Sequence, residues 1–207
     1  MKPFRILIVD DHAILRMGLA SMLESEPDMK VIGEADDGKS AIEATMRLRP
    51  DLVIMDLIMP NMSGAEAVRQ ILSSRPKTKV MILTSFGSSE ALSQALAAGA
   101  HGAMLKNAAF PELLSGLRAI ATGGQAISAE ITRFLGANPP IGLLSPRQQD
   151  VLSALVRGLS NKDIARLLNL SPDVVKEYLS SLFEKIGAAN RTEAVAIALR
   201  RQLLKNT

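Results

Sequence analysis

The sequence predicts an α/β protein in which a doubly wound parallel sheet of five strands precedes a small all-helical region. Three observations predict it. Short apolar runs alternate with amphipathic stretches over residues 1–122, which is typical of βα units joined by short connections. A segment rich in glycine and proline follows. Beyond it, capping signals mark the starts of helices.

The expected strands are short, apolar and bounded by turn residues, as in strands that are buried on both faces. They are residues 4–9, 31–34, 52–55, 80–84 and 103–106. Helices are expected near residues 13–25, 38–48, 64–74, 89–98 and 110–122. In the last of these helices Leu113, Leu117 and Ile120 share one stripe, which predicts a face that packs on the sheet. Five such units imply a doubly wound parallel sheet.

The C-terminal part, residues 143–207, is expected to contain four helices. Ser145, Ser160 and Ser171 each stand where an N-cap is expected, and Pro146 and Pro172 follow two of them. Only about three residues separate the second helix from the third, which is helix-turn-helix spacing. The third helix is expected over residues 172–186 and the fourth over residues 192–203.

Between the two regions, residues 123–142 are interpreted as a linker, because the periodicity fades after two glycines and the segment ends in a Pro- and Gly-containing stretch. Charge differs across it. Residues 143–207 hold 10 Lys and Arg and 6 Asp and Glu, a net +4, whereas residues 1–142 hold 14 and 15, a net −1. The asymmetry favours a nucleic-acid partner for the C-terminal part, although +4 is modest.

The composition narrows the protein class. The chain of 207 residues contains no cysteine, which excludes disulfides and thiolate metal sites and fits a reducing compartment. No apolar stretch approaches the roughly 18 residues that a membrane span needs, and the N-terminus lacks a signal-peptide core. We therefore expect a soluble, cytoplasmic protein with no membrane partner.

Acidic residues stand at the ends of two expected strands. Asp56 ends the apolar run Leu52–Met55, and Asp10 and Asp11 follow the first strand. Ligands of open parallel sheets bind beyond the carboxyl ends of the strands, so these acids are placed for chemistry. Three neighbouring carboxylates repel one another unless a hard cation such as Mg²⁺ joins them.

The order of several short motifs resembles that of a two-component response regulator of the NarL/FixJ type, a flavodoxin-like receiver domain joined to a LuxR-type helix-turn-helix domain. The resemblance covers nearly the whole chain. Its receiver motifs are Val9-Asp10-Asp11-His12, Asp56 to Gly64, Leu83-Thr84-Ser85 and Ala98 to Lys106. Its effector motifs are Leu144 to Arg147, Gly158 to Ala165, Val175-Lys176, Lys185-Ile186-Gly187 and Asn190 to Ala194.

The resemblance implies a role for each matched receiver residue. Asp56 would accept a phosphoryl group from a phosphohistidine on a sensor histidine kinase. Asp10, Asp11 and Asp56 would hold Mg²⁺ with the backbone carbonyl of Ile58. Lys106 would pair with a phosphoryl oxygen.

Thr84 and His12 leave alternatives open. The resemblance implies that the Thr84 hydroxyl would bind another phosphoryl oxygen and report the modified state. The same residue could instead be an ordinary β-branched strand residue. His12 stands beside the acids and invites a metal-ligand interpretation, but a structural role at the start of a helix is favoured.

By the same resemblance, the third C-terminal helix would read DNA and the fourth would form a homodimer. Val175, Leu179, Leu182 and Ile186 are expected to form the core stripe of the third helix. The candidate contacts with double-stranded DNA are Lys176, Glu177, Ser180, Tyr178, Lys185, Asn161 and Lys162. The candidate dimerisation residues are Val195, Leu199 and Leu203.

Several positions depart from the family pattern. Ala103 stands where an aromatic residue is usual, and Tyr178 and Val174 stand where His and Thr are usual. Glu177 and Glu184 make the third helix unusually acidic. The resemblance as a whole nevertheless implies a phosphorylation-dependent, DNA-binding transcriptional regulator that is not an enzyme. The alternative is an atypical regulator that acts mainly through protein contacts, with weak or phosphorylation-independent DNA binding.

Overall fold

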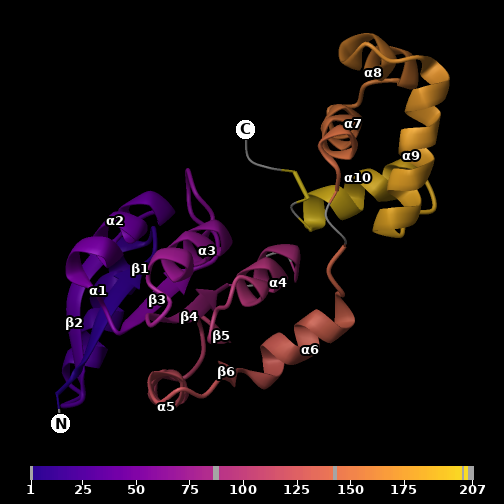
Figure 1. The fold of residues 1–207 in the computed structure, drawn as a ribbon. Coiled ribbons are helices and arrows are strands. Elements are labelled where there is room, and N and C mark those ends of the chain that lie inside the picture. The colour runs from indigo at the N-terminus through magenta and orange to yellow at the C-terminus, as the bar shows by residue number, and fades with distance from the viewer. Residues whose placement is uncertain (1, 86–88, 142–143, 202, 205–207) are drawn as a thin grey trace. The chain divides into compact units, whose positions relative to one another are not determined.

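The computed structural model describes residues 2–85, 89–141, 144–201 and 203–204. The chain divides into two compact units, Met1–Asn138 and Pro139–Thr207. Strands occur in the first, and the second is helical (Figure 1). This order agrees with the predicted class.

The first unit is built on a parallel sheet with the strand order β2-β1-β3-β4-β5-β6. Its strands are β1 (Phe4–Val9), β2 (Met29–Ala35), β3 (Leu52–Asp56), β4 (Lys79–Thr84), β5 (Gly102–Leu105) and β6 (Ala126–Ile127). Its helices are α1 (Ala13–Glu24), α2 (Gly38–Leu48), α3 (Gly64–Ser74), α4 (Ser89–Ala97), α5 (Phe110–Ala121) and α6 (Ala129–Ala137).

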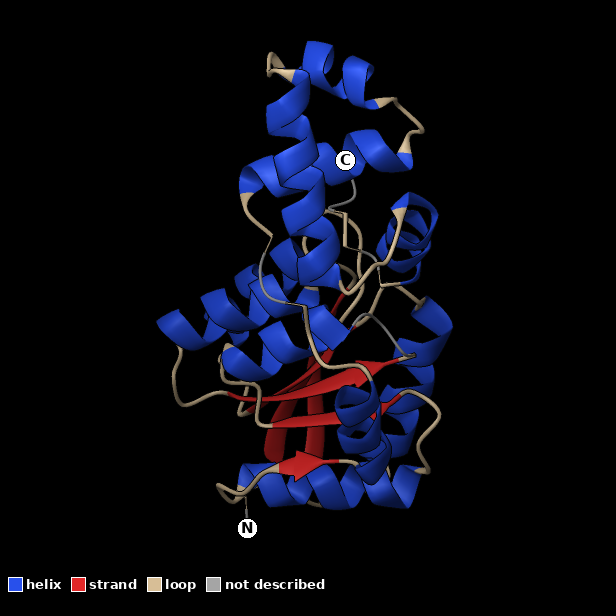
Figure 2. Ribbon diagram, turned by 90° about the vertical axis from the view of Figure 1, so that its right-hand side faces the viewer, coloured by secondary structure: helices blue, strands red, loops and turns tan. Residues whose placement is uncertain are grey.

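Helices cover both faces of the sheet (Figure 2). Alternate residues of each strand point to opposite faces, so β3 sends Val53 and Met55 into one core and Leu52 and Ile54 into the other. Helices α2, α3 and α4 complete the first core, and α1 and α5 complete the second. The apolar strands predicted at residues 4–9 and 52–55 are therefore confirmed as strands largely buried on both faces, whereas β2, at the edge of the sheet, is only partly buried.

A sixth strand and a sixth helix extend the sheet beyond the five units that the sequence predicts. β6 pairs with β5, and α6 packs on the sheet with Ile131 fully buried in the same core as Ala103. Most of the segment interpreted as a linker, residues 123–142, is thus regular structure that belongs to the first unit. A two-residue strand carries no periodic signal, which is why the pattern missed it.

The second unit consists of α7 (Pro146–Val156), α8 (Asn161–Leu168), α9 (Pro172–Ile186) and α10 (Arg191–Arg200). The serine N-caps of the first three helices each accept a backbone N–H, as predicted. The buried stripe of α9 is also confirmed, at Val175, Leu179, Leu182 and Ile186. Among the described residues, no helix is long and apolar enough to span a bilayer.

Candidate functional site

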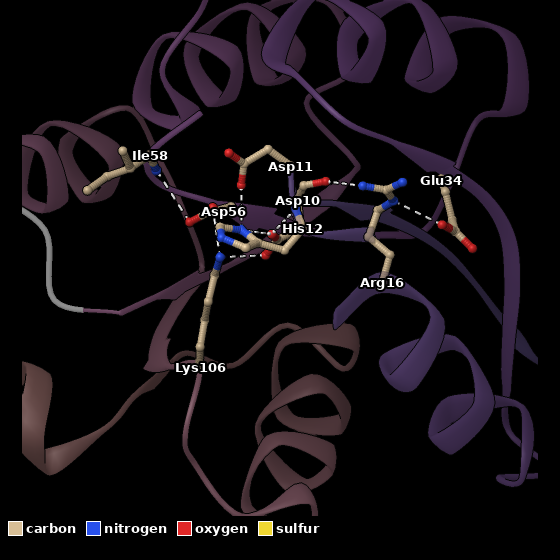
Figure 3. A network of polar contacts seen from close by, with 8 residues as sticks. All are labelled: Asp10, Asp11, His12, Arg16, Glu34, Asp56, Ile58 and Lys106. Atoms are coloured by element: carbon tan, nitrogen blue, oxygen red, sulfur yellow. Dashed lines mark hydrogen bonds and ion pairs between the residues drawn. The ribbon is translucent and has the colours of Figure 1, made fainter. Parts of the chain in front are cut away.

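The predicted acids converge at the point where the strand order reverses. β1 and β3 are neighbours in the sheet, so Asp10, just after β1, lies beside Asp56, the last residue of β3. Carboxylate oxygens of Asp10, Asp11 and Asp56 and a ring nitrogen of His12 all lie within 4.8 Å of one another (Figure 3). The structure thus places the ligand-type side chains at the switch point of the sheet, where doubly wound folds bind their ligands.

Lys106, the residue after β5, bridges the two buried acids. Its ammonium nitrogen lies 2.7 Å from Oδ2 of Asp10 and 2.8 Å from Oδ2 of Asp56 (Figure 3). Burial alone would lower the pKa of Lys106, but its hydrogen bonds to Asp10 and Asp56 outweigh burial and raise that pKa. Lys106 therefore stays positively charged at neutral pH.

Burial raises the pKa of the Asp56 carboxyl above its usual range. The hydrogen bond from Lys106 and its charge oppose the shift, and the nearby Asp10 adds to it. A backbone donor also reaches this carboxylate, because the N–H of Ile58 lies 3.3 Å from Oδ1 of Asp56. The site therefore holds a desolvated carboxylate. An additional positive charge nearby would stabilise its ionised form.

Gly64, at the start of α3, fixes the backbone around Asp56. Its N–H donates to the carbonyl of Leu57. A Cβ atom at this position would lie 2.1 Å from the backbone oxygen of Asp56, so no other residue fits without moving the strand end. The glycine of the sequence motif is thus explained by close backbone contact.

Asp11 and His12 complete the acidic turn. The His12 N–H donates to Oδ1 of Asp10 at 2.9 Å, and its Nδ1 lies 2.6 Å from Oδ1 of Asp11. The His12 side chain is 71% exposed. The His12 side chain therefore contacts the acids directly. The predicted structural role at the start of a helix did not include this contact.

Thr84 ends β4 beside this cluster, and its side chain is buried. Its hydroxyl has no hydrogen-bond partner among the described residues. A buried hydroxyl without a partner is costly, so it is a candidate donor for a group that binds here. Ile58, two residues after Asp56, is 41% exposed. Phe86, two residues after Thr84 in the sequence, lies outside the described residues.

The donor set fits a hard divalent cation. The structure gathers three carboxylates, and oxygen is the ligand that Mg²⁺ prefers. The sequence contains no cysteine to favour a softer metal.

In the second unit, α9 presents an outward face. Lys176, Glu177 and Ser180 are exposed, as the periodicity predicts. The Lys176 ammonium pairs with Asp173 at 3.0 Å, so the basic group of this face is partly neutralised by a neighbouring acid. Glu177 and Glu184 are exposed as well. The exposed face of the predicted recognition helix therefore carries both positive and negative side chains.

The remaining candidate DNA contacts differ in their surroundings. Tyr178 is half-buried and packs against the helical core. Lys185 extends to 3.5 Å from Oε1 of Gln148. Asn161 accepts from Arg191, whose other terminal nitrogen donates to the Leu159 carbonyl. Lys162 is exposed.

The predicted dimerisation residues are not equally free. Leu199 of α10 is 60% exposed. Val195 and Leu203 are half-buried and pack against the core of the second unit.

Two family models together match most of the chain. Residues 6–118 match the response regulator receiver domain, and residues 142–198 match the bacterial regulatory proteins of the luxR family. The chain belongs to the response regulators of the NarL/FixJ type. This family consists of DNA-binding transcriptional regulators rather than enzymes.

Relatives match this response regulator over almost its full length. It is 35% identical over 207 residues to the nitrate/nitrite response regulator protein NarP of Escherichia coli (strain K12), which covers 97% of this chain and 96% of that protein. It is 33% identical over 208 residues to the transcriptional regulatory protein LiaR of Bacillus subtilis (strain 168), with 97% and 99% covered.

Solved structures share its fold. RcsB from Salmonella enterica serovar Typhimurium, bound to a promoter in the presence of the phosphomimetic BeF3−, gives a TM-score of 0.71 at 26% identity, covering 97% of this chain and 100% of that chain. The response regulator ChrA of a heme-sensing two-component system gives a TM-score of 0.59 at 32% identity, with 99% and 100% covered.

Proposed function

We propose that Asp56 of this response regulator is the phosphoacceptor. The observation that supports the proposal is the convergence of Asp56, Asp10 and Lys106 from three strand ends at one point. A carboxylate oxygen of Asp56 attacks the phosphorus of a phosphohistidine on a sensor histidine kinase. The P–N bond breaks, and the leaving imidazole takes up a proton.

Asp10, Asp11, Asp56 and the Ile58 carbonyl would hold Mg²⁺. When bound, the ion neutralises charge on the transferring group, in a reaction that otherwise depends mainly on positioning. Lys106 moves from its bridging position to pair with a phosphoryl oxygen, and Thr84 donates its hydroxyl to another. The modified Asp56 thereby keeps Lys106 as a partner and gains the Thr84 hydroxyl, which the unmodified carboxylate lacks.

The second unit would bind double-stranded DNA through α9 as a homodimer formed through α10. Its net charge of +4 and the exposed Lys176 and Lys162 support contact with phosphates. Solved structures of RcsB include dimers bound to DNA. Exposed Leu199 is the candidate dimer contact. A cytoplasmic location, which the lack of cysteine fits, is part of the same proposal.

The alternative is a regulator that acts mainly through protein contacts. The ion pair between Lys176 and Asp173 and the exposed Glu177 and Glu184 favour it, because they reduce the positive charge of α9. A mobility shift with fragments selected from the source genome, measured across salt concentrations, separates the two functions. DNA binding through phosphates weakens steeply as salt rises. A protein that retains no fragment at low salt supports the protein-contact function.

A further inference from the structure

Arg16 of α1 joins two strands beside the acidic site. Its Nη1 donates to the backbone carbonyl of Asp10 at 2.6 Å, and its Nε donates to Oε2 of Glu34, on β2, at 3.0 Å (Figure 3). The Arg16 side chain is only 16% exposed. The guanidinium is thus held between the end of β1 and the neighbouring strand.

The bond from Arg16 completes the anchoring of Asp10. The Asp10 N–H donates to the carbonyl of Ala35, and its Oδ1 accepts from the N–H of His12. Its carbonyl belongs to the peptide group that leads to Asp11. The bond from Arg16 to that carbonyl fixes the peptide plane before Asp11, and the bond from the His12 N–H to Asp10 fixes the plane after it, so the direction in which the Asp11 side chain leaves the backbone is set.

We propose that Arg16, oriented by Glu34, is a positioning residue for divalent cation binding by Asp10 and Asp11. Arg16 acts through the Asp10 carbonyl, and Glu34 acts through Arg16. The proposal rests on the proposed function, because it takes these acids to be the ligands of Mg²⁺. Partners that orient ligand residues typically change metal affinity 10- to 100-fold, roughly, when they are lost.

The sign of the effect separates positioning from charge. Arg16 places a positive charge beside a cation site, so electrostatics alone predicts that its removal tightens Mg²⁺ binding. Positioning predicts that the same removal weakens binding. Lysine keeps the charge but lacks the planar fork that reaches two acceptors at once. Arg16→Lys therefore tests geometry at constant charge.

The experiment is a calorimetric titration of the full chain with Mg²⁺ alone. We expect Arg16→Gln and Arg16→Lys each to raise the Kd for Mg²⁺ about tenfold or more, with circular dichroism confirming that both variants are folded. An Arg16→Gln protein that binds Mg²⁺ as tightly as the parent, or more tightly, overturns the proposal. So does an Arg16→Lys protein with the parental Kd.

Two further variants test Glu34 at equal charge. Glu34→Gln keeps an oxygen that can accept from Nε, whereas Glu34→Ala removes it, and both lose the same negative charge. We expect the Ala variant to bind Mg²⁺ more weakly than the Gln variant. Equal Kd values for the two would contradict the role of Glu34.

Arg118 provides a matched control. It is a second arginine of the same unit held by acids, with Nε 2.8 Å from Oδ2 of Asp28 and Nη2 2.9 Å from Oε2 of Glu26, and neither acid belongs to the site. Arg118→Gln removes the same charge as Arg16→Gln. We expect it to lower thermal stability and leave the Kd for Mg²⁺ unchanged.

Phosphorylation distinguishes failure of this proposal from failure of the proposed function. We expect Arg16→Gln to be labelled by acetyl phosphate at nearly the parental rate once Mg²⁺ is saturating. A parent that binds Mg²⁺ and is labelled on Asp56, beside an Arg16→Gln protein with an unchanged Kd, overturns only the role of Arg16. A parent that binds no Mg²⁺ overturns both.

Discussion

The ammonium of Lys106 lies 2.8 Å from Oδ2 of Asp56, yet the pKa of that carboxyl is raised, because burial outweighs the contact. A carboxyl whose pKa is raised in the folded protein stabilises the fold when it is protonated. This contribution is complete below the unfolded pKa of 3.8 and is lost as the pH rises through the folded pKa. Ionised Asp56 therefore destabilises the fold at neutral pH.

We predict that Asp56→Asn raises the free energy of unfolding at pH 7, and that its advantage over the parent shrinks as pH falls toward 3.8. Urea denaturation at several pH values measures it. Lys106→Met is the opposite case, because it leaves two buried carboxylates without their cation. It should cost roughly 3 kcal/mol, the low end for breaking a buried ion pair. An Asp56→Asn protein less stable than the parent at pH 7 would contradict the electrostatic account.

The acyl phosphate is predicted to be long-lived. Ile58 and Phe86 come two residues after Asp56 and Thr84, and neither side chain can hold an attacking water by hydrogen bonding. Replacing both with Asn should speed spontaneous loss of phosphate, measured by the decay of the phosphorylated mass. The single Ile58→Asn variant measures the contribution of Ile58 without that of Phe86. Decay of the double variant no faster than that of the parent would contradict the prediction that these two side chains protect the acyl phosphate from water.

Coupling between Asp56 and DNA binding is predicted to be modest, because Ala103 offers no aromatic ring that could change position. A modification shifts an equilibrium only by its differential interaction with the two states. DNA affinity before and after labelling with acetyl phosphate measures the coupling. A hundredfold tightening would show that another element carries the signal. Ile131, buried in the same core as Ala103, makes α6 the element to test first.

Lys176 of α9 is predicted to contact phosphate or guanine. Lys176→Ala should weaken DNA binding and, for a phosphate contact, reduce the salt slope by about one unit. Asp173→Asn removes its partner and should strengthen binding slightly, since exposed ion pairs are worth roughly 0.2–1 kcal/mol.

Glu177→Gln should raise non-specific affinity and relax discrimination at one base pair. If none of the three changes binding, α9 does not read DNA.

Much of the fold follows from local patterns. β1 and α9 have the predicted bounds, because the signal for each lies within the segment itself. For β1 it is a largely apolar run, and for α9 it is a capped 3.6-residue periodicity. The acids of the site were also predictable, since parallel strands bring their carboxyl ends to one edge. β6 was not, because two residues form a strand only where the exposed edge of β5 receives them.

Other features depend on tertiary contacts. Ser128 caps α6, and Ile131, Phe134 and Leu135 have helical spacing, so this helix left a signal that the glycines before it obscured. The pairing of Arg16 with Glu34 has no such signal. The two residues are 18 positions apart and meet only because β2 lies beside β1.

The central claim is that one carboxylate, Asp56, carries the phosphoryl group. After labelling with acetyl phosphate and Mg²⁺, borohydride reduces an acyl phosphate to a homoserine residue, which peptide mass spectrometry locates in the chain. The account predicts homoserine at position 56 alone and none in the Asp56→Asn protein. Homoserine at Asp10 or Asp11, or labelling of Asp56→Asn to the parental extent, would contradict it.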